Sequence, residues 1–269
     1  MRKRVATSLV GIPILVVVSW FGFPWLMLAV LAVTLSALVE LYRLGIKAGV
    51  RLLLGPGLVA AIAIVLTIQF RNDLQMYLLP LIPAAVLIVA LLAAIARAGR
   101  RAFLDWSLTV SAVLYVALLL SHLLLLRDVG ENAEGRNWVV FALITTFATD
   151  TGAFFTGTAI GRHKMAPHVS PRKTWEGALG GFVWAVGVAL VLGAVMKLPV
   201  PAWQQALLGM AVGVVGQAGD LLESRIKRAA HAKEAGVLVP GHGGVMDRLD
   251  SVLFTVPVIY YLVVFAFGR

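Results

Sequence analysis

Residues 76–96 read MYLLPLIPAAVLIVALLAAIA, a stretch of 21 residues without a charged side chain. A helix needs roughly 20 such residues to cross the hydrocarbon core of a bilayer, so this segment predicts a transmembrane helix. The whole chain of 269 residues has a similar character, with 60% hydrophobic and 13% charged residues. Soluble domains carry about 25% charged residues. We therefore expect an all-α, polytopic integral membrane protein.

Nine apolar windows of this kind predict about nine transmembrane helices. The first two are separated only by residues 21–24 (FGFP), which we interpret as a tight turn. The basic residues 2–4 (RKR) precede an apolar run without an obvious small-residue cleavage site, so we expect a retained first helix rather than a signal peptide. The windows are residues 5–20, 25–39, 52–69, 76–96, 107–126, 138–160, 178–196, 202–219 and 251–268.

The distribution of basic residues predicts the orientation of these helices. With the N-terminus in the cytoplasm, 18 of the 23 Lys and Arg residues fall in cytoplasmic segments and 5 on the other side. Cytoplasmic loops of membrane proteins carry such an excess, so the pattern supports nine crossings and a cytoplasmic N-terminus. The net charge of +10 does not indicate a nucleic-acid partner, because the basic residues are divided among the loops. Cysteine is absent, which excludes disulfides and thiolate metal sites.

Polar residues that could carry chemistry are concentrated in the second half of the chain. We interpret residues 1–135 as a transmembrane scaffold and residues 136–269 as a catalytic region. Within the catalytic region we expect two cytoplasmic loops, at residues 161–177 and 223–246.

Eight of the nine windows contain no charged residue, and the sixth contains Asp150. A charge at the centre of a membrane helix costs roughly 2.5 to 3.5 kcal/mol, so Asp150 indicates a polar cavity, a partner or an ion. A polar contact with Thr149 or Thr156 is the structural alternative. Glu40 stands one turn before Arg43 at the end of the second window, where an interfacial ion pair is a sufficient explanation.

Three further acids border the cytoplasmic ends of the last two windows. Asp220 follows the eighth window, while Asp247 and Asp250 precede the ninth at a spacing that places them on one helix face. The connecting loop is short, so we expect the three to lie close together. Carboxylates suit a hard cation such as Mg²⁺, and we predict that Asp220 and Asp247 hold it while Asp250 orients the site. A second cation such as K⁺ is left open, and boundary ion pairs with neighbouring arginines are the alternative.

Two basic segments accompany these acids. Residues 224–233 (SRIKRAAHAK) lead into residues 240–244 (PGHGG), whose glycines allow backbone N–H groups to face phosphate oxygens. Residues 170–177 (SPRKTWEG) add two phosphate-seeking side chains and Glu176, a candidate either to cap the next helix or to join the site. Together the basic, glycine-rich and acidic groups form the parts of a metal–triphosphate site. A loop that contacts anionic lipid would explain the lysines but not the glycine turn or the acids.

These residues resemble the phosphatidate cytidylyltransferases, also called CDP-diacylglycerol synthases. The family signature runs from Ser-x-x-Lys-Arg through Lys-Asp to His-Gly-Gly and Asp-Arg-x-Asp, and residues 170–177 correspond to a second family element. This chain departs from the signature at Glu234, where Asp is usual, and at Val239, where a larger apolar residue is usual. The matching residues are Ser224, Lys227, Arg228, Lys233, Pro240, His242, Gly243, Gly244, Asp247, Arg248 and Asp250.

The resemblance implies an enzyme that transfers CMP from CTP to phosphatidate, giving CDP-diacylglycerol and pyrophosphate. It implies Asp220, Asp247, Asp250, Lys227 and His242 as catalytic residues, with a structural role equally open for His242. The residues that the resemblance assigns to substrate binding are Asp150, Arg172, Lys173, Ser224, Arg228, Lys233, Gly243, Gly244 and Arg248.

The expected partners are CTP, phosphatidate and membrane lipids, and the resemblance also implies a homodimer. We expect the protein in a bacterial inner membrane, with its active site facing the cytoplasm. A membrane transporter with an acidic intramembrane site is the main alternative, although the acids gather at one surface rather than at the midplane. A phosphatidyltransferase that consumes CDP-lipid would need an Asp-Gly-x-x-Ala-Arg motif, which this sequence lacks. A purely structural membrane protein leaves the glycines and acids unexplained.

Overall fold

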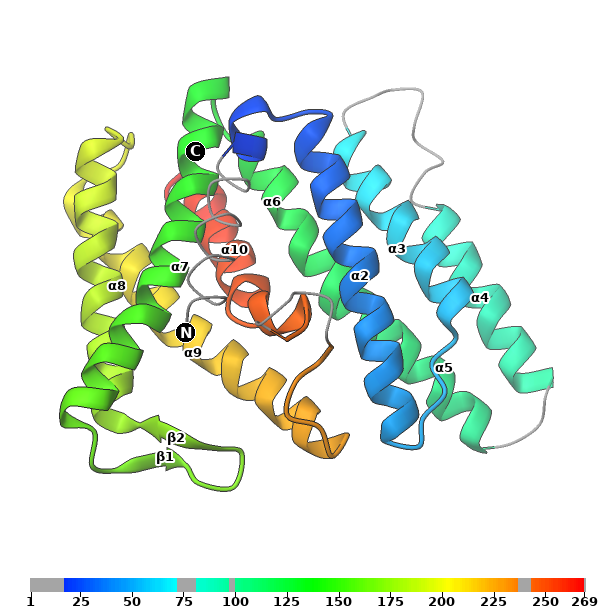
Figure 1. Cartoon of the computed structure of the whole chain (residues 1–269). Helices are drawn as coiled ribbons and strands as arrows, with labels where there is room; N and C mark the ends of the chain where they lie inside the picture. Colours follow the sequence, from blue (N-terminus) through cyan, green and yellow to red (C-terminus); the bar gives the residue numbers. More distant parts are fainter. Residues whose placement is uncertain (1–16, 72–80, 97–99, 237–242, 269) are drawn as a thin grey trace. The chain divides into compact units, whose positions relative to one another are not determined.

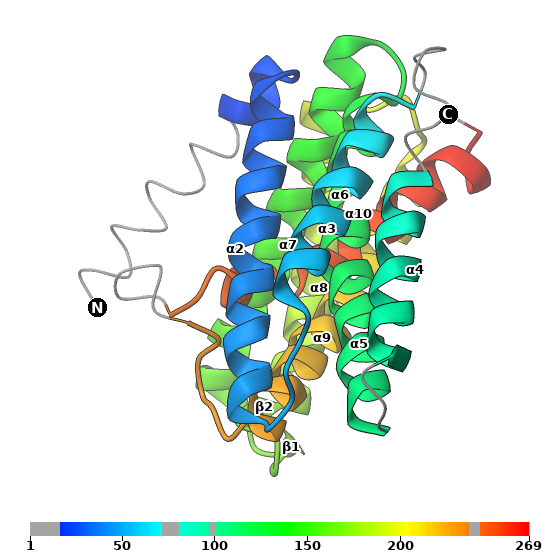
Figure 2. The ribbon, with the colours of Figure 1, turned by 90° about the vertical axis from the view of Figure 1, so that its right-hand side faces the viewer.

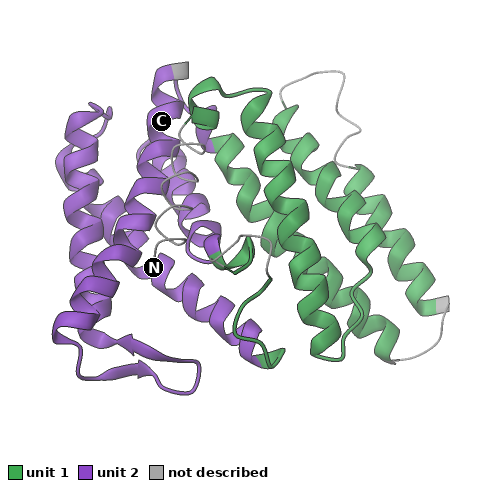
Figure 3. Ribbon diagram, in the orientation of Figure 1, with its two compact units in different colours: residues 1–125, 229–247 green, residues 126–228, 248–269 purple. Residues whose placement is uncertain are grey.

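The computed structural model describes residues 17–71, 81–96, 100–236 and 243–268. It confirms the all-α polytopic membrane class, because five helices are long and apolar enough to cross a membrane and three shorter apolar helices accompany them. Eight predicted windows coincide with these helices, and of the first window only residues 17–20 are described, as helix. The chain forms two compact units (Figure 3). Unit 1 comprises residues 1–125 and 229–247, and unit 2 comprises residues 126–228 and 248–269.

Unit 1 is built from helices that lie next to one another, as Figure 2 shows for α2 to α5. A π-helical turn leads from α5 into α6. The elements are α2 (Trp25–Lys47), α3 (Leu54–Gln69), α4 (Leu81–Ala96), α5 (Arg100–Val113), η2 (Leu114–Leu118) and α6 (Leu119–Arg127), whose last two residues belong to unit 2.

The connection between α2 and α3 is fastened to α5. The backbone N–H of Arg51 donates to Asp105 Oδ1 at 3.0 Å, and an Nη2 of Arg101 donates to the carbonyl of Gly49 at 2.8 Å. Arg51 and Arg101 therefore lie at the same end of unit 1, as the distribution of basic residues predicts.

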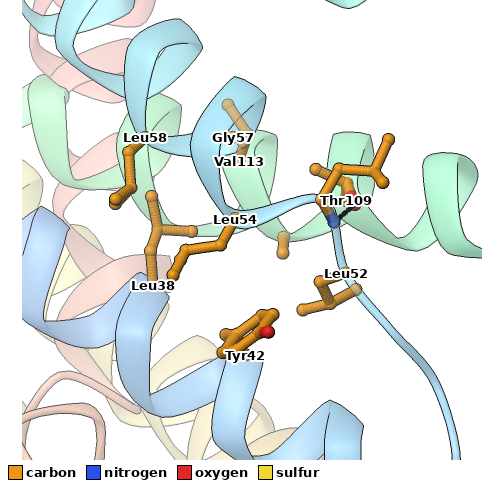
Figure 4. A pocket seen from close by; sticks show the side chains of 10 residues that line it. Leu38, Tyr42, Leu52, Leu54, Gly57, Leu58, Thr109 and Val113 are labelled. Atoms are coloured by element: carbon orange, nitrogen blue, oxygen red, sulfur yellow. Dashed lines mark hydrogen bonds between the residues drawn. The ribbon is translucent and has the colours of Figure 1, made fainter. Parts of the chain in front are cut away.

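Large apolar side chains fill the space between α2, α3 and α5. Leu38 and Tyr42 of α2 face Leu54 and Leu58 of α3 around a cavity of about 20 Å³ (Figure 4). Such a cavity holds about one water molecule, so it is too small for a substrate. The scaffold role of residues 1–135 stays a prediction.

Unit 2 contains the remaining membrane helices and a small hairpin. Figure 1 shows α7 and α8 side by side with the hairpin at one end. The elements are α7 (Asn132–Ile160), β1 (Lys164–Ala166), β2 (Ser170–Thr174), α8 (Trp175–Val195), α9 (Ala202–Ala229), the 3-10 turn η3 (Met246–Arg248), which begins in unit 1, α10 (Val252–Tyr261) and the π-helical turn η4 (Leu262–Ala266).

Small residues bring the helices of unit 2 into backbone contact. A Cβ added to Gly177 of α8 would lie 2.9 Å from the Ala153 carbonyl oxygen of α7, and one added to Gly209 of α9 would lie 2.7 Å from Val186 Cα of α8. Stripes of small residues allow this close approach between membrane helices. The stripe on α8 consists of Gly177, Gly181, Ala185, Ala189 and Gly193, one residue in every four.

The first expected cytoplasmic loop, residues 161–177, is mostly ordered secondary structure. Strands β1 and β2 form an antiparallel pair in which Lys164 faces Thr174. Helix α8 begins directly afterwards, and Thr174 Oγ1 accepts a hydrogen bond from the N–H of Gly177 at 3.1 Å as its N-cap. The helix cap is therefore Thr174, and the expectation that Glu176 caps this helix is wrong.

The second expected loop, residues 223–246, is also partly helical. Helix α9 continues to Ala229, so Asp220 lies within it rather than after it. A charged residue ends an apolar window but does not end a helix, so the eighth window stops at residue 219 although α9 continues to Ala229. Asp247 belongs to the 3-10 turn η3, and Asp250 precedes α10, so the expected common α-helical face is wrong.

Candidate active site

A cavity of about 400 Å³ opens in unit 2 between α7, α8, α9 and the hairpin. Ligand pockets commonly measure about 300 to 1,000 Å³, so this space can admit a substrate. Its lining combines acids, bases and apolar groups. The lining residues are Asp150, Ala153, Phe154, Gly157, Thr158, Lys164, Met165, Arg172, Lys173, Thr174, Gly177, Ala178, Gln217 and Asp220.

Two predicted site residues, Asp150 of α7 and Asp220 of α9, share this cavity. Asp250 lies near them, because a Cβ added to Gly219 would lie 2.5 Å from the Asp250 carbonyl oxygen. Ser251 links the elements further, since its hydroxyl donates to Asp150 Oδ1 at 3.3 Å. The glycine in α9 thus allows the start of α10 to approach the helix that carries Asp220.

The electrostatics of this group favour a bound cation. Burial, followed by the negative charges of Asp220 and Asp150, raises the pKa of the Asp250 carboxyl well above its usual range. Its Oδ1 accepts the N–H of Ser251 at 2.7 Å, which acts in the opposite direction. Carboxylates that disfavour one another's ionisation are stabilised by a positive charge placed among them.

Basic side chains supply part of that charge. Lys173 Nζ lies 2.6 Å from Asp220 Oδ2, with side chains 22% and 29% exposed, so the pair is partly shielded from solvent. Arg172 and Lys164 line the same cavity from the two strands. The structure therefore brings Arg172 and Lys173 together with Asp150 and Asp220, four residues that the sequence places up to 70 positions apart.

The end of α9 is docked onto the hairpin. Arg228 Nε donates to the Val169 carbonyl at 3.1 Å, in the turn between β1 and β2. Lys227 Nζ pairs with Glu223 Oε1 at 2.9 Å, and Glu223 is only 1% exposed. Ser224 lies between them on the same helix. Lys227 thus pairs with a buried acid one turn earlier in α9.

Glu176 fixes the other end of the hairpin. Its carboxylate accepts the backbone N–H groups of Arg162 at 3.1 Å and His163 at 3.2 Å, and it also contacts the His163 ring nitrogen Nδ1. These contacts tie the start of the hairpin to the first turn of α8. They hold in place the strands that carry the basic side chains.

The cavity offers oxygen donors of the kind that Mg²⁺ prefers. Among the residues that the structure describes, no group of three or more His, Asp or Glu side chains is arranged to hold a metal ion. Mg²⁺ usually takes only one or two carboxylates and completes its shell with water and substrate phosphates. The carboxylates fit such a partial shell, while the metal itself and any second cation stay predictions.

Gly243 and Gly244, the described end of the glycine-rich loop, lie in unit 1 beside Asp247. Asp247 Oδ2 accepts the N–H groups of Ala235 at 2.9 Å and Gly244 at 2.8 Å. Gly243 has a φ of +86°, a conformation that favours glycine. Because Asp247 belongs to unit 1 and Asp220 to unit 2, a metal ion shared between them stays a prediction.

Two of the remaining predicted site residues lie within the described part of the chain. Lys233 and Arg248 are exposed, on either side of the glycine-rich loop. His242 lies outside the described residues, as do Val239 and Pro240 of the signature. Their predicted roles remain as the resemblance implies.

Glu40 has contacts that the sequence does not predict. Its side chain is fully buried in α2, and it accepts the N–H groups of Val245 at 3.0 Å and Met246 at 2.8 Å. The expected interfacial ion pair with Arg43 is wrong, because the carboxylate faces a loop rather than the membrane surface. The sequence carries no signal for this role, because the apolar window ends at residue 39, whereas α2 continues for seven residues beyond Glu40 to Lys47.

Comparisons with known proteins identify the family of this chain. The sequence model of the cytidylyltransferase family matches residues 2–266. The phosphatidate cytidylyltransferase of Staphylococcus saprophyticus is 30% identical over 270 residues, covering 98% of this chain and 99% of that protein. The Staphylococcus epidermidis protein of the same name is 31% identical over 268 residues with the same coverage, and the Bacillus subtilis one is 37% identical over 151 residues, 56% of this chain and 55% of that protein. The chain is therefore a member of the cytidylyltransferase family.

Proposed function

We propose that this chain is a CTP:phosphatidate cytidylyltransferase that makes CDP-diacylglycerol and pyrophosphate for phospholipid synthesis. Family membership supports an enzyme over the transporter alternative. The observation that carries the proposal is the unit 2 cavity, in which Asp150 and the Lys173–Asp220 pair lie together among membrane-crossing helices. A reaction between a water-soluble nucleotide and a lipid needs a polar chamber within such a framework.

The reaction requires two anionic substrates, phosphatidate and CTP, to approach each other closely. An oxygen of the phosphatidate phosphate attacks the α-phosphorus of CTP, and the bond from that phosphorus to the bridging oxygen breaks to release pyrophosphate. The phosphatidate oxygen is already anionic, so little help from a general base is needed. The main task of the protein is to offset repulsion and to align the two phosphates.

Basic side chains of the hairpin are placed for this task. Lys164, Arg172 and Lys173 line the cavity and can bind phosphate oxygens of the substrates. Asp220 holds Lys173 in position, and Ser251 orients Asp150. When bound, a divalent cation such as Mg²⁺ would screen the phosphates and stabilise the leaving pyrophosphate, with Asp220 and Asp247 as its predicted ligands.

The lipid substrate requires an apolar approach to the same space. Phe154 lines the cavity and is 64% exposed, and Ala153, Met165 and Ala178 add further apolar lining. We infer that the phosphatidate headgroup enters from the bilayer while its tails stay in lipid. The acidic and basic groups then meet the phosphate at the inner part of the cavity.

The proposal includes the orientation and assembly that the sequence predicts. The hairpin end of unit 2 carries Arg162, Lys164, Arg172 and Lys173, which supports a cytoplasmic face for the cavity. CTP would reach the site from that side, in a bacterial inner membrane. A homodimer is the assembly that the family resemblance implies.

One assay tests the proposal. Purified protein in lipid nanodiscs is incubated with radiolabelled CTP, phosphatidate and Mg²⁺, and the lipid fraction is extracted. We expect a lipid-soluble cytidine product together with one pyrophosphate for each CTP consumed. Consumption of CTP without a labelled lipid, or no consumption in folded protein, would contradict the proposed activity.

A further inference from the structure

One buried and one half-buried carboxylate bind the described backbone on both sides of residues 237–242 in unit 1. Glu40 accepts the N–H groups of Val245 and Met246, and Asp247 accepts those of Ala235 and Gly244. Four backbone donors of residues 235–246 are therefore bound by two side chains. Asp247 belongs to the family signature, whereas Glu40 lies some 200 residues earlier in α2 and outside it.

The loop fits closely around the Glu40 carboxylate. A Cβ added to Gly236 would collide with Glu40 Oε1, and one added to Gly244 would collide with Glu40 Oε2. The carboxylate is fully buried, so bulk water does not replace a lost hydrogen bond. The position of Val245 and Met246 consequently depends on this one side chain.

A carboxylate suits the task because it offers two acceptor oxygens and no donor. Glu40 Oε1 binds one N–H and Oε2 binds the next one along the chain. A glutamine would keep one acceptor and place an NH₂ donor against the other N–H. An aspartate would keep both acceptors but withdraw them by one methylene.

We propose that Glu40 is a positioning residue for the loop that carries Gly243 and Gly244, and that through this loop it sets the affinity for CTP. The second part rests on the proposed function and on the family resemblance, which assigns Gly243 and Gly244 to substrate binding. Glu40 acts through the backbone it binds and does not touch the substrate. Its loss changes substrate binding more than the rate of the chemical step.

The first test compares Glu40→Gln with Arg43→Gln in the full-length protein. Arg43 is exposed on the same helix and is the partner that an interfacial ion pair would require. For Glu40→Gln we expect the KM for CTP to rise about tenfold, with kcat changed less than threefold, because one buried donor loses its acceptor. Arg43→Gln should keep the wild-type KM.

A second measurement does not depend on catalysis. Hydrogen exchange followed by mass spectrometry reports on peptides that contain Val245 and Met246. We expect their amides to exchange about tenfold faster in Glu40→Gln than in the wild-type protein, and at the wild-type rate in Arg43→Gln. A role in folding alone would lower the yield of active protein without this local change or the split between KM and kcat.

If Glu40→Gln does not fold, Gly236→Ala provides a second test, because its added methyl group disturbs the same contact from the side of the loop. Its control is Gly55→Ala, where an added Cβ meets nothing within 4 Å. Wild-type exchange in Glu40→Gln or Gly236→Ala would overturn the positioning role. Faster exchange with an unchanged KM for CTP would overturn the link to nucleotide affinity. An inactive wild-type enzyme would instead contradict the proposed function, while the exchange result would still decide the role of Glu40.

Discussion

Units 1 and 2 differ in the cavities between their helices. Helices α2, α3 and α5 of unit 1 surround a cavity of about 20 Å³ that is lined mainly by apolar side chains. Helices α7, α8 and α9 of unit 2 meet through glycine and alanine and leave a cavity of about 400 Å³. Close backbone contact along part of a helix thus coexists with open space at its polar end. The two units therefore differ in the size and polar lining of these cavities and not in their use of small residues, because α3 of unit 1 also buries Gly57, Ala60, Ala61 and Ala63.

The largest expected effect comes from the acid inside the cavity. Asp220→Asn should lower turnover of CTP about a thousandfold, because it removes the charge that holds Lys173 and the predicted metal ligand, an effect worth several kcal/mol. Asp105→Asn is the matched change in unit 1, where the carboxylate accepts the N–H of Arg51. It should leave turnover within threefold. Equal activity of the two variants would contradict the assignment of the unit 2 cavity as the active site.

Asp247→Asn distinguishes the role of this side chain in binding backbone N–H groups from its predicted role as a metal ligand. A single amide oxygen can still accept the N–H groups of Ala235 and Gly244, so hydrogen exchange of these amides should stay near wild type. If Asp247 also holds a metal, turnover should fall about a hundredfold and the Mg²⁺ requirement should rise. Near-normal activity would mean that Asp247 binds the loop backbone but does not hold a metal ion that turnover requires. Loss of amide protection would instead show that the charge itself orders the loop.

The close contact between α8 and α9 of unit 2 can be tested by enlarging one glycine. Gly209→Val should destabilise the protein by about 1 to 3 kcal/mol, because its side chain meets the backbone of α8 near Val186. Gly187→Val, on α8 where an added Cβ meets nothing within 4 Å, should have little effect. Thermal unfolding in detergent, followed by circular dichroism, provides the comparison. A similar small change in both variants would mean that close helix contact does not support unit 2.

The smallest expected effect concerns the junction of the hairpin and α8. Thr174→Ala removes the N-cap that binds the N–H of Gly177 and should cost about 1 kcal/mol of stability. Turnover should change little, since the basic side chains keep their strand. Thr151→Ala, on α7 but outside the cavity lining and without a cap role, is the control. A large loss of activity in Thr174→Ala would mean that the cap positions the cavity residues.

The sequence was sufficient for features that depend on local composition. Apolar windows predicted eight helices that the structure describes, and Asp150 was recognised as a cavity residue because charge is costly in a bilayer. Asp220 is predicted as an acid at the end of an apolar window, and Arg172 and Lys173 as basic side chains of a cytoplasmic segment; all three line the same cavity.

Features that depend on distant contacts were not predictable in this way. Glu40 binds Val245, 205 positions away, and nothing near Glu40 in the sequence indicates that partner. Residues 170–174 (SPRKT) lack the alternation of apolar and polar residues that identifies a strand, so the hairpin was read as a loop. The extension of α9 past Asp220 was missed because hydropathy marks the membrane boundary rather than the end of a helix.

The most direct test of the central claim uses the absence of cysteine from this chain. A single cysteine is introduced as Thr158→Cys, which lines the unit 2 cavity, or as Arg51→Cys, an exposed position in unit 1, and its reaction with a water-soluble thiol reagent is timed. If the cavity binds the nucleotide, CTP with Mg²⁺ should slow labelling of Thr158→Cys about tenfold and leave Arg51→Cys unchanged. Equal labelling of Thr158→Cys with and without CTP, in protein that still turns CTP over, would contradict the assignment of this cavity as the active site.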